Sequence, residues 1–352
     1  MNCINFLFMK MKSIRKISPQ LGATLVDIEA PKPSSYEVLV KVKATSICGT
    51  DVHIYSWNEW AQNRIKNLPQ TMGHEFAGEV VEVGSCVKNI KVGDYVSAET
   101  HIPCGGCIQC MTGQMHICHN VKILGVDCDG CFAEYITVPE SVIWKNDKSI
   151  PPEFASVQEP IGNAVYCTLV EPVTAKTVVI LGAGPTGLFS TGVAKVAGAA
   201  QVIVVEVEQF RLDIAKKMGA DICINPKNED PLKRILDETK GIGADVVLDM
   251  AGSPKTIELA IKAVRRGGRF SAFGITPGTI TIDYNSIIFK GVTIYGISGR
   301  LMFDTWFKVR NLLAYKKLDI SPVITHKLKL EEFDKGFSEM LNKTAAKVIL
   351  FP

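Results

Sequence analysis

The chain has 352 residues, which is enough for about two domains of ordinary size with well-developed cores. Hydrophobic residues make up 47% of it and charged residues 21%, a balance that excludes an intrinsically disordered chain. The 39 basic and 36 acidic residues give a net charge of +3, which argues against nucleic acid or a membrane surface as the main partner. No apolar run approaches the roughly 18 residues needed to cross a bilayer, so we do not expect an integral membrane protein.

The segment 3–9 is apolar, but no basic region precedes it and no small-residue cleavage site follows it. We therefore expect an additional N-terminal tail rather than a secretory signal, with the fold starting near Met11. The expected location is the cytoplasm.

Residues 11–150 contain short β segments separated by Gly, Pro and Asp, for example 38–44, 79–83 and 95–98. Gly84 and the pair Gly93-Asp94 are turn signals between them. This pattern predicts a β domain with long functional loops.

From about residue 160 short apolar runs alternate with helix-length segments. The predicted strands are 178–181, 201–206, 222–224, 244–250, 268–273 and 292–296, and the helices include 209–218, 231–240 and 254–264. Such alternation predicts a parallel, doubly wound sheet and hence the α/β class. After Arg300 a helix is expected at 303–316, followed by a stretch too short to form a domain. We therefore predict one domain from 1–160 plus 301–352 and another from 161–300.

The first predicted strand of this sheet runs directly into Gly182-Ala183-Gly184-Pro185-Thr186-Gly187. Gly182 permits a tight turn, Gly184 lets the backbone approach a pyrophosphate, and Gly187 allows close helix–strand packing. The next strand ends in Glu206, 19 residues past Gly187, where a carboxylate can accept from the adenosine ribose hydroxyls. Since it would also repel a 2′-phosphate, NAD is favoured over NADP. The alternative is a glycine-rich turn in an ordinary α/β domain.

Two further features concern this dinucleotide site. Arg211 is expected to pack along the adenine, although it could instead meet a phosphate. The residues that end two later strands lie at the carboxyl edge of the sheet, where ligands bind, and are candidates for the nicotinamide end. These residues are Phe273, Gly274, Ile275, Ile297 and Ser298. The alternative is that they simply mark the ends of the strands and bind no ligand.

Eleven cysteines need an explanation, and four of them, Cys104, Cys107, Cys110 and Cys118, fall within 15 positions. In a large chain without an export signal, clustering of this kind favours a metal over disulfides. Four thiolates saturate a tetrahedral zinc ion, so this site would brace its loop and would not bind substrate. A disulfide cluster and a four-iron–four-sulfur cluster are the alternatives.

A second set of metal-ligand types is dispersed: Cys48, His74, Glu75 and Glu159. Cysteine, histidine and carboxylate together form the ligand set of a catalytic zinc with one open position. Asp51 is a plausible acceptor for the ligating imidazole. Taken singly, each of these residues also fits an ordinary structural role. Their spacing in the sequence alone does not show that they lie together in the fold.

The chain resembles the medium-chain zinc-dependent dehydrogenases over essentially its whole length. The matching motifs are Cys48-Gly49-Thr50-Asp51-x-His53, Gly73-His74-Glu75, the four-cysteine loop and the 182–187 turn. This family pairs a GroES-like, β-rich catalytic domain with a Rossmann dinucleotide-binding domain. The segments 50–60, 132–135, 160–165, 299–306 and 321–326 narrow the resemblance to members that oxidise L-threonine.

The resemblance implies roles for individual residues. Cys48, His74 and Glu75 would bind the catalytic zinc, while Thr50 and His53 would form the proton relay. Glu159 would be either a direct ligand or a neighbour that tunes the metal. The implied NAD contacts include Thr186, Glu206, Arg211, Phe273, Gly274, Ile275, Ile297 and Ser298.

The reaction implied is oxidation of the 3-hydroxyl of L-threonine to L-2-amino-3-oxobutanoate, with hydride transfer to NAD. Arg300 is a candidate for the substrate carboxylate, but it fits a structural ion pair equally well. A homotetramer is expected, alongside the 2-amino-3-ketobutyrate CoA ligase that consumes the unstable product. The alternatives are a polyol or secondary-alcohol dehydrogenase of the sorbitol or butanediol type, and a non-catalytic NAD-binding or zinc-scaffold protein. The short-chain type is excluded, because Tyr-x-x-x-Lys is absent from the sequence.

Overall fold

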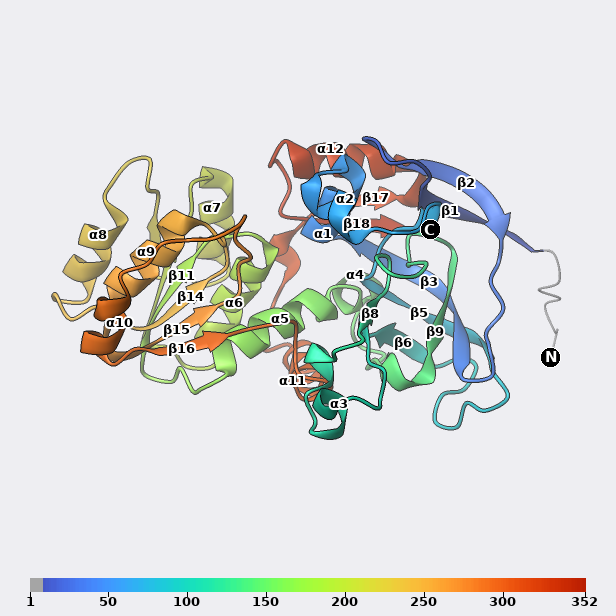
Figure 1. Ribbon diagram of the computed structural model, residues 1–352, viewed down its shortest axis with the longest axis horizontal. Coiled ribbons are helices and arrows are strands. Elements are labelled where there is room, and N and C mark those ends of the chain that lie inside the picture. The colour runs from blue at the N-terminus through green and yellow to red at the C-terminus, as the bar shows by residue number, and fades with distance from the viewer. Residues whose placement is uncertain (1–8) are drawn as a thin grey trace. The chain divides into compact units, whose positions relative to one another are not determined.

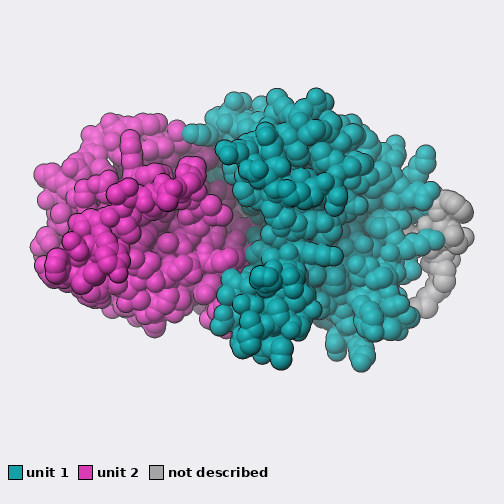
Figure 2. All heavy atoms as spheres, in the orientation of Figure 1, with its two compact units in different colours: residues 1–159, 324–352 teal, residues 160–323 magenta. Residues whose placement is uncertain are grey.

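The computed structural model describes residues 9–352 and divides into two compact units (Figure 2). Unit 1 contains the chain up to Glu159 together with Ile324–Pro352, and unit 2 is Pro160–Val323. The first strand begins at Lys10, one residue before the predicted start of the fold. The predicted N-terminal tail therefore lies almost wholly outside the described residues.

Unit 1 is built on strand β3 (Glu37–Ile47), which pairs with three other strands of a seven-stranded sheet. Along β3 the side chains of Lys41 and Lys43 point outward and apolar ones pack inward, as expected for a strand with one covered face. The other members of this sheet are β5 (Phe76–Val83), β6 (Tyr95–Ala98), β9 (Tyr135–Pro139), β10 (Ile143–Lys145), β17 (Ile324–Lys329) and β18 (Lys347–Phe351).

Two smaller sheets and short helices complete unit 1 (Figure 1). The sheets are β2 (Thr24–Glu29), β1 (Lys10–Lys16) and β4 (Gln70–Thr71), and the pair β7 (His101–Ile102) and β8 (Lys122–Ile123). The helices are α1 (Gly49–Ser56), α2 (Glu59–Arg64), α3 (Ile108–Met111), α4 (Pro152–Ala155) and α12 (Phe333–Leu341), with 3-10 turns at Met115–Ile117, Glu140–Val142 and Leu330–Glu332. The β-rich prediction is confirmed, although it did not include these helices, which are too short to produce a clear period.

Unit 2 is a six-stranded parallel sheet in the order β13-β12-β11-β14-β15-β16, flanked by helices (Figure 1). Its central strands are apolar and buried on both faces, as expected for a sheet covered on both sides. The strands are β11 (Thr177–Leu181), β12 (Gln201–Val205), β13 (Ile222–Ile224), β14 (Ala244–Asp249), β15 (Val264–Ala272) and β16 (Thr293–Gly296). Strand β11 lies between β12 and β14, and this reversal of strand order is where such sheets bind ligands.

The helices of unit 2 follow the predicted alternation. They are α5 (Gln158–Leu169), which starts in unit 1, α6 (Pro185–Val196), α7 (Gln209–Lys217), α8 (Pro231–Glu238), α9 (Pro254–Ala263), α10 (Tyr284–Lys290) and α11 (Asp304–Ala314), followed by a 3-10 turn at Ser321–Val323. The doubly wound parallel sheet predicted from the sequence is thus confirmed.

Most boundaries agree with the sequence-based ones to within three residues, and two differ by four residues or more. Strand β15 starts at Val264 rather than 268, because Val264 pairs with Ala244 before the register shifts. Residues 301–323 belong to unit 2, whereas the prediction assigned them to the first domain. The reason is packing, since Leu318 fills the space that a side chain at Gly192 of α6 would occupy. Among the described residues, none of the helices is both long and apolar enough to span a bilayer.

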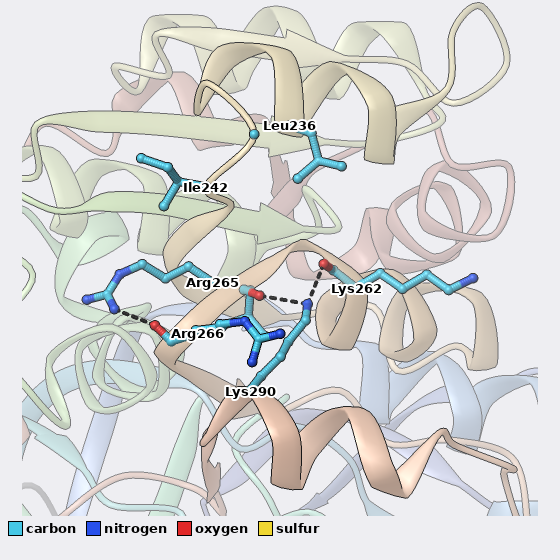
Figure 3. Close-up of a pocket in the computed structure, with 8 residues that line it drawn as sticks. Leu236, Ile242, Lys262, Arg265, Arg266 and Lys290 are labelled. Carbon is cyan, nitrogen blue, oxygen red and sulfur yellow. Dashed lines mark hydrogen bonds between the residues drawn. The ribbon is translucent and has the colours of Figure 1, made fainter.

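A hollow of about 510 Å³ lies at the amino edge of the parallel sheet and is lined by several cationic side chains (Figure 3). Lys290 Nζ donates to the backbone carbonyls of Ile261, Lys262 and Val264, at 2.9, 2.7 and 2.9 Å. Lys290 therefore stabilises the carboxyl end of α9. Arg265 is paired with Asp245 at 2.7 Å, so this hollow is part of the scaffold.

Candidate metal and dinucleotide sites

Three predicted metal ligands come together in unit 1. Cys48 follows the last residue of β3, while His74 and Glu75 immediately precede β5. Because Thr45 of β3 pairs with Phe76 of β5, the two strand ends bring these side chains to one place. One ligand atom from each of Cys48, His74 and Glu75 lies within 4.8 Å of the others. This grouping provides one sulfur, one imidazole nitrogen and one carboxylate oxygen.

Asp51 connects two members of this cluster. Its Oδ2 accepts a hydrogen bond from the backbone N–H of Cys48 at 2.9 Å, and its Oδ1 lies 3.5 Å from His74 Nδ1. Nε2 is therefore the His74 nitrogen that remains for a metal, as in other carboxylate–histidine–metal arrangements. Burial by itself lowers the pKa of His74, but the charges of Asp51 and Cys48 raise it well above its ordinary value.

The two oxygens of Glu75 differ in their surroundings. Oε2 accepts from Ser46 Oγ and lies 2.5 Å from Lys347 Nζ, and both charged residues are buried. Oε1 is buried without a hydrogen-bond partner in the structure. A buried carboxylate oxygen that is left unpaired beside a thiol and an imidazole fits a metal cation, because such a charge is costly without a partner. The residues present therefore fit zinc.

Lys347, the first residue of β18, was not predicted as part of the site. Its ammonium also donates to the backbone carbonyl of Ile47 at 3.1 Å. Burial lowers the pKa of Lys347, but the neighbouring charges of Glu75 and Cys48 outweigh this effect and raise it. The charge of Glu159, a buried residue of α5, acts on the pKa of Lys347 in the same direction. Glu159 is not one of the three grouped ligands.

The two predicted relay residues lie on α1. Thr50 Oγ1 is 3.9 Å from Cys48 Sγ, and His53 is one turn further along the helix. His53 Nδ1 lies 2.7 Å from the side-chain nitrogen of Asn58. Burial of part of the ring lowers the pKa of His53.

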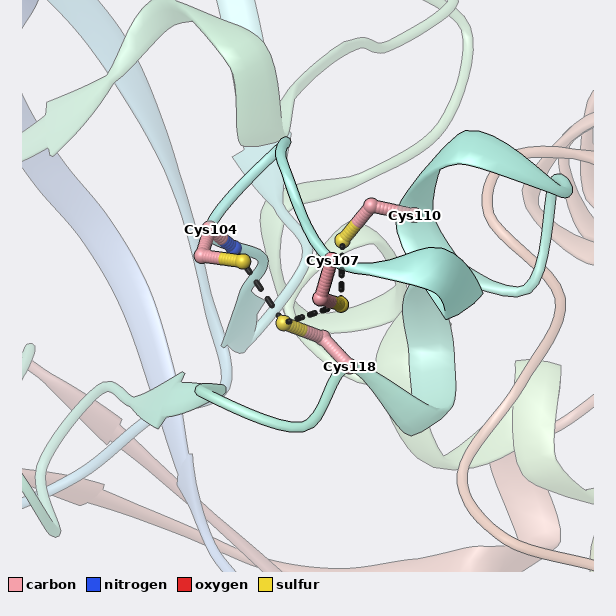
Figure 4. A group of neighbouring side chains, drawn as sticks. All are labelled: Cys104, Cys107, Cys110 and Cys118. Carbon is pink, nitrogen blue, oxygen red and sulfur yellow. Dashed lines mark hydrogen bonds between the residues drawn. The ribbon is translucent and has the colours of Figure 1, made fainter.

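The four clustered cysteines also meet, on the loop between β7 and β8 (Figure 4). Cys107 Sγ lies 3.5 Å from Cys110 Sγ and 3.7 Å from Cys118 Sγ, and all four thiols are free. Hydrogen bonds from the backbone N–H groups of Cys110 and His119 lower the pKa of Cys107 to about 6. Burial, by contrast, raises the pKa of Cys110 to about 12. The geometry fits a four-sulfur zinc site rather than disulfides, because the four Sγ atoms all lie within 4.8 Å of one another.

The glycine turn of unit 2 has the predicted construction. Gly182 has φ +96°, and a Cβ at Gly187 would lie 2.0 Å from the Gly182 carbonyl oxygen, so the fold itself requires glycine at both positions. Gly184 is different: its φ is −62°, and a Cβ there would meet no atom within 4 Å. The open space at the N-terminus of α6 is a cradle that suits a phosphate group.

Glu206 lies beside this turn. Its Oε2 accepts from the backbone N–H of Ala183 at 2.7 Å, and its Oε1 accepts from those of Val207 and Glu208 at 2.8 and 3.0 Å. These three bonds fix the carboxylate and leave roughly one of its four acceptor positions for a ligand hydroxyl. The Arg211 guanidinium lies 5.5 Å from the ring of Phe210.

The remaining predicted contacts occupy the carboxyl ends of β15 and β16. The backbone N–H groups of Phe273 and Gly274 donate to Asp249, while Ile275 is 89% exposed. Ile297 is buried and donates to Ala272 at 2.9 Å, and Ser298 follows it at the surface. Thr186 lies in the first turn of α6.

Arg300 does not form part of an open surface. Its side chain is only 1% exposed, packs against Gly162 and donates to Asn163 Oδ1 at 3.1 Å. The contact described for Arg300 is thus with a neutral amide, and its side chain is buried.

Comparison with known proteins agrees with this architecture. The model of the alcohol dehydrogenase GroES-like domain matches residues 34–150, and that of zinc-binding dehydrogenases matches 185–315. The chain is 55% identical to the L-threonine 3-dehydrogenase of Pyrococcus horikoshii over 342 residues, which cover 97% of this chain and 98% of that protein.

Solved structures of dehydrogenases share this two-unit fold at lower sequence identity. A zinc-binding dehydrogenase from Sinorhizobium meliloti bound to NADP superposes with a TM-score of 0.91 at 29% identity, covering 98% of this chain and 100% of that one. The 2R,3R-butanediol dehydrogenase from Bacillus subtilis gives 0.89 at 30% identity, covering 97% and 99%. The chain therefore belongs to the zinc-containing medium-chain dehydrogenases, in the branch formed by the L-threonine 3-dehydrogenases.

Proposed function

We propose that the protein oxidises the 3-hydroxyl group of L-threonine to L-2-amino-3-oxobutanoate and transfers the hydride to NAD. The observation that carries the proposal is the Cys48–His74–Glu75 cluster with its unpaired Glu75 oxygen, in a chain 55% identical to an L-threonine 3-dehydrogenase. A polyol or secondary-alcohol substrate is the second candidate, because the butanediol dehydrogenase has the same architecture.

In this proposal Cys48, His74 and Glu75 hold the catalytic zinc ion. When bound there, zinc supplies Lewis acidity that lowers the pKa of an alcohol substrate. Glu159 tunes the charge at this site from its position near Lys347. The four thiols on the β7–β8 loop hold a second, closed zinc that keeps this loop in shape.

The chain's own contribution to chemistry is to move the hydroxyl proton. Thr50 is 3.9 Å from the Cys48 sulfur and accepts the proton from the substrate hydroxyl. A ribose hydroxyl of bound NAD would link Thr50 to His53, and the exposed His53 side chain releases the proton to solvent. Both residues are on one short helix, so their separation is fixed by the helix backbone.

Unit 2 positions the coenzyme. The backbone around Gly182, Gly184 and Gly187 would hold the pyrophosphate at the N-terminus of α6, beside Thr186. Glu206 accepts from the adenosine ribose, and its negative charge disfavours a 2′-phosphate, so we propose NAD rather than NADP. Arg211 lies along the adenine. The segments that follow β15 and β16 would hold the nicotinamide end, namely Phe273, Gly274, Ile275, Ile297 and Ser298.

We also propose that the protein is a cytoplasmic homotetramer. Strand β16 is the edge of its sheet, and Tyr284, Phe289 and Ile294 beside it are exposed, so a second copy of the chain could pair there and cover them. The 2-amino-3-ketobutyrate CoA ligase is the proposed functional partner, because it consumes the unstable keto acid. Light scattering tests the oligomer, since a monomer at micromolar concentration would contradict it.

The substrate is tested by measuring NADH formation with L-threonine, sorbitol and 2,3-butanediol under identical conditions. We expect L-threonine to have the highest kcat/KM, and a higher value for either of the other alcohols would contradict the main proposal. Elemental analysis should find two zinc ions per chain, and Cys48→Ser should lose one zinc and turnover while NADH binding persists. Full activity of that variant would refute the metal role of Cys48.

A further inference from the structure

Asn58 connects the end of α1 to the start of α2. It is the N-cap of α2, where its Oδ1 accepts from the backbone N–H of Ala61 at 3.1 Å. Its own backbone N–H donates to the carbonyl of His53 at 3.3 Å, and its Nδ2 lies 2.7 Å from His53 Nδ1. The orientation of the side-chain amide is thus determined by its helix-capping bond.

This orientation determines the protonation of the imidazole. Because Oδ1 already accepts from Ala61, the amide group that faces His53 is the NH₂ end, which can only donate. His53 Nδ1 must therefore be the acceptor. In a neutral imidazole one nitrogen accepts and the other carries the proton, so the proton of His53 is on Nε2.

We propose that Asn58 is a positioning residue that holds His53 neutral, in the tautomer with its proton on Nε2. An incoming proton has to bind Nδ1, where the Asn58 N–H and a new imidazole N–H would face each other as two donors. Proton uptake by His53 therefore requires the Asn58 contact to break, which disfavours the imidazolium form. The consequence for catalysis rests on the proposed relay role of His53, whereas the tautomer does not.

The other groups around His53 do not set its charge in the same direct way. Its ring lies 5.9 Å from the ring of Trp60, tilted by 46°. On α1 itself, Asp51 is directed to Cys48 and His74. On α12, which packs against α1, Asp334 accepts from Tyr55 Oη at 2.9 Å.

The nearby cations are also engaged. Lys16 donates to backbone carbonyls, among them those of Gly22 and Tyr55 at 2.8 and 3.1 Å. Arg64 of α2 pairs with Asp127, and Glu59 at the start of that helix is exposed. Within residues 9–352, Asn58 is therefore the polar side chain that contacts the imidazole directly.

The test uses Asn58→Asp and Asn58→Ser in the full-length protein, because both residues retain a good N-cap for α2. Aspartate puts an acceptor where the NH₂ group was and stabilises the imidazolium, while serine is too short to reach Nδ1. Asn63→Asp, which adds the same charge at the other end of α2, is the matched control. Thermal unfolding and NADH binding of each variant verify that it is folded.

The primary readout is the ¹⁵N NMR signal of His53 as a function of pH, assigned with the variant His53→Gln. In the native protein we expect an acceptor Nδ1 and a protonated Nε2. In Asn58→Asp the pKa of His53 should rise by about one unit or more, a tenfold or larger change in proton affinity, while Asn63→Asp should leave it nearly unchanged. Asn58→Ser should produce a smaller rise.

A native His53 with its proton on Nδ1 would overturn the proposal, as would an unchanged pKa in Asn58→Asp. If Asn58→Asp fails to fold, the proposal is still tested by the tautomer of His53 in the native protein and by the pKa of His53 in Asn58→Ser. The acid limb of kcat/KM for threonine oxidation should move to higher pH together with the pKa of His53. If the pKa of His53 rises in Asn58→Asp but the acid limb of kcat/KM does not move, the relay role of His53 is refuted. The positioning role of Asn58 would then still be supported.

Discussion

Asp51 Oδ1 lies 3.5 Å from His74 Nδ1, while Oδ2 of the same carboxylate accepts from the backbone of Cys48. One buried side chain therefore aligns two metal ligands that are distant in the sequence. We expect Asp51→Asn to weaken zinc binding at this site by about 10–100-fold, because the imidazole loses its charged acceptor. Zinc release to a chelator measures the effect.

The four-cysteine site serves as an internal control and should release its zinc at the native rate. Equal release from both sites would mean that the substitution acts through general unfolding.

The Lys347–Glu75 pair should contribute much more to stability than other ion pairs of unit 1. Removing one partner of a buried pair leaves an uncompensated charge, so we expect Lys347→Met to cost about 3–5 kcal/mol in the free energy of unfolding. The matched control is Lys327→Met, which removes an exposed partner of Glu153 at 2.8 Å and should cost at most about 1 kcal/mol. Urea unfolding of unit 1 measures both. Similar costs for the two variants would contradict this assessment.

Two glycines of the dinucleotide turn should respond to alanine in opposite ways. Gly184→Ala adds a methyl group to open space, so thermal stability should be retained while NADH affinity falls about tenfold. Gly187→Ala places a methyl group against the Gly182 carbonyl and should destabilise unit 2 by about 1–3 kcal/mol. Thermal unfolding and NADH fluorescence titration separate the two effects. Native affinity in Gly184→Ala would exclude the phosphate from this position.

Coenzyme preference should depend on the charge of Glu206. Glu206→Gln keeps the size of the side chain but removes the charge that opposes a 2′-phosphate, so the preference for NADH over NADPH should fall about tenfold. The substituted amide also places an NH₂ group near backbone donors, which should weaken binding of both coenzymes. Titration with each coenzyme gives the ratio. An unchanged ratio would mean that another group selects the coenzyme.

The sequence predicts local features better than assembled ones. The four-cysteine loop and the glycine turn are each contained in a short segment, so their spacing was informative. The Cys48–Glu75 cluster depends on the pairing of β3 with β5, which no spacing reveals, and only the family resemblance linked its members. Nothing in the sequence indicates a role for Lys347, because it is a single lysine that precedes a short apolar run. The single available signal was a charged residue at the start of a strand that is otherwise buried.

Strand β18, which carries Lys347, pairs with β3 and with the edge strand β17 in the main sheet of unit 1. During translation the sequence of unit 2 is complete at Val323, before this strand has been made. Unit 2 is therefore formed by one uninterrupted segment, whereas unit 1 is assembled from two segments that flank it in the sequence. The catalytic metal pocket, by contrast, obtains its buried ammonium only when synthesis has passed Phe351. The metal pocket is thus complete only after the C-terminal segment has paired with β3, whereas the glycine turn and Glu206 need no residue outside unit 2.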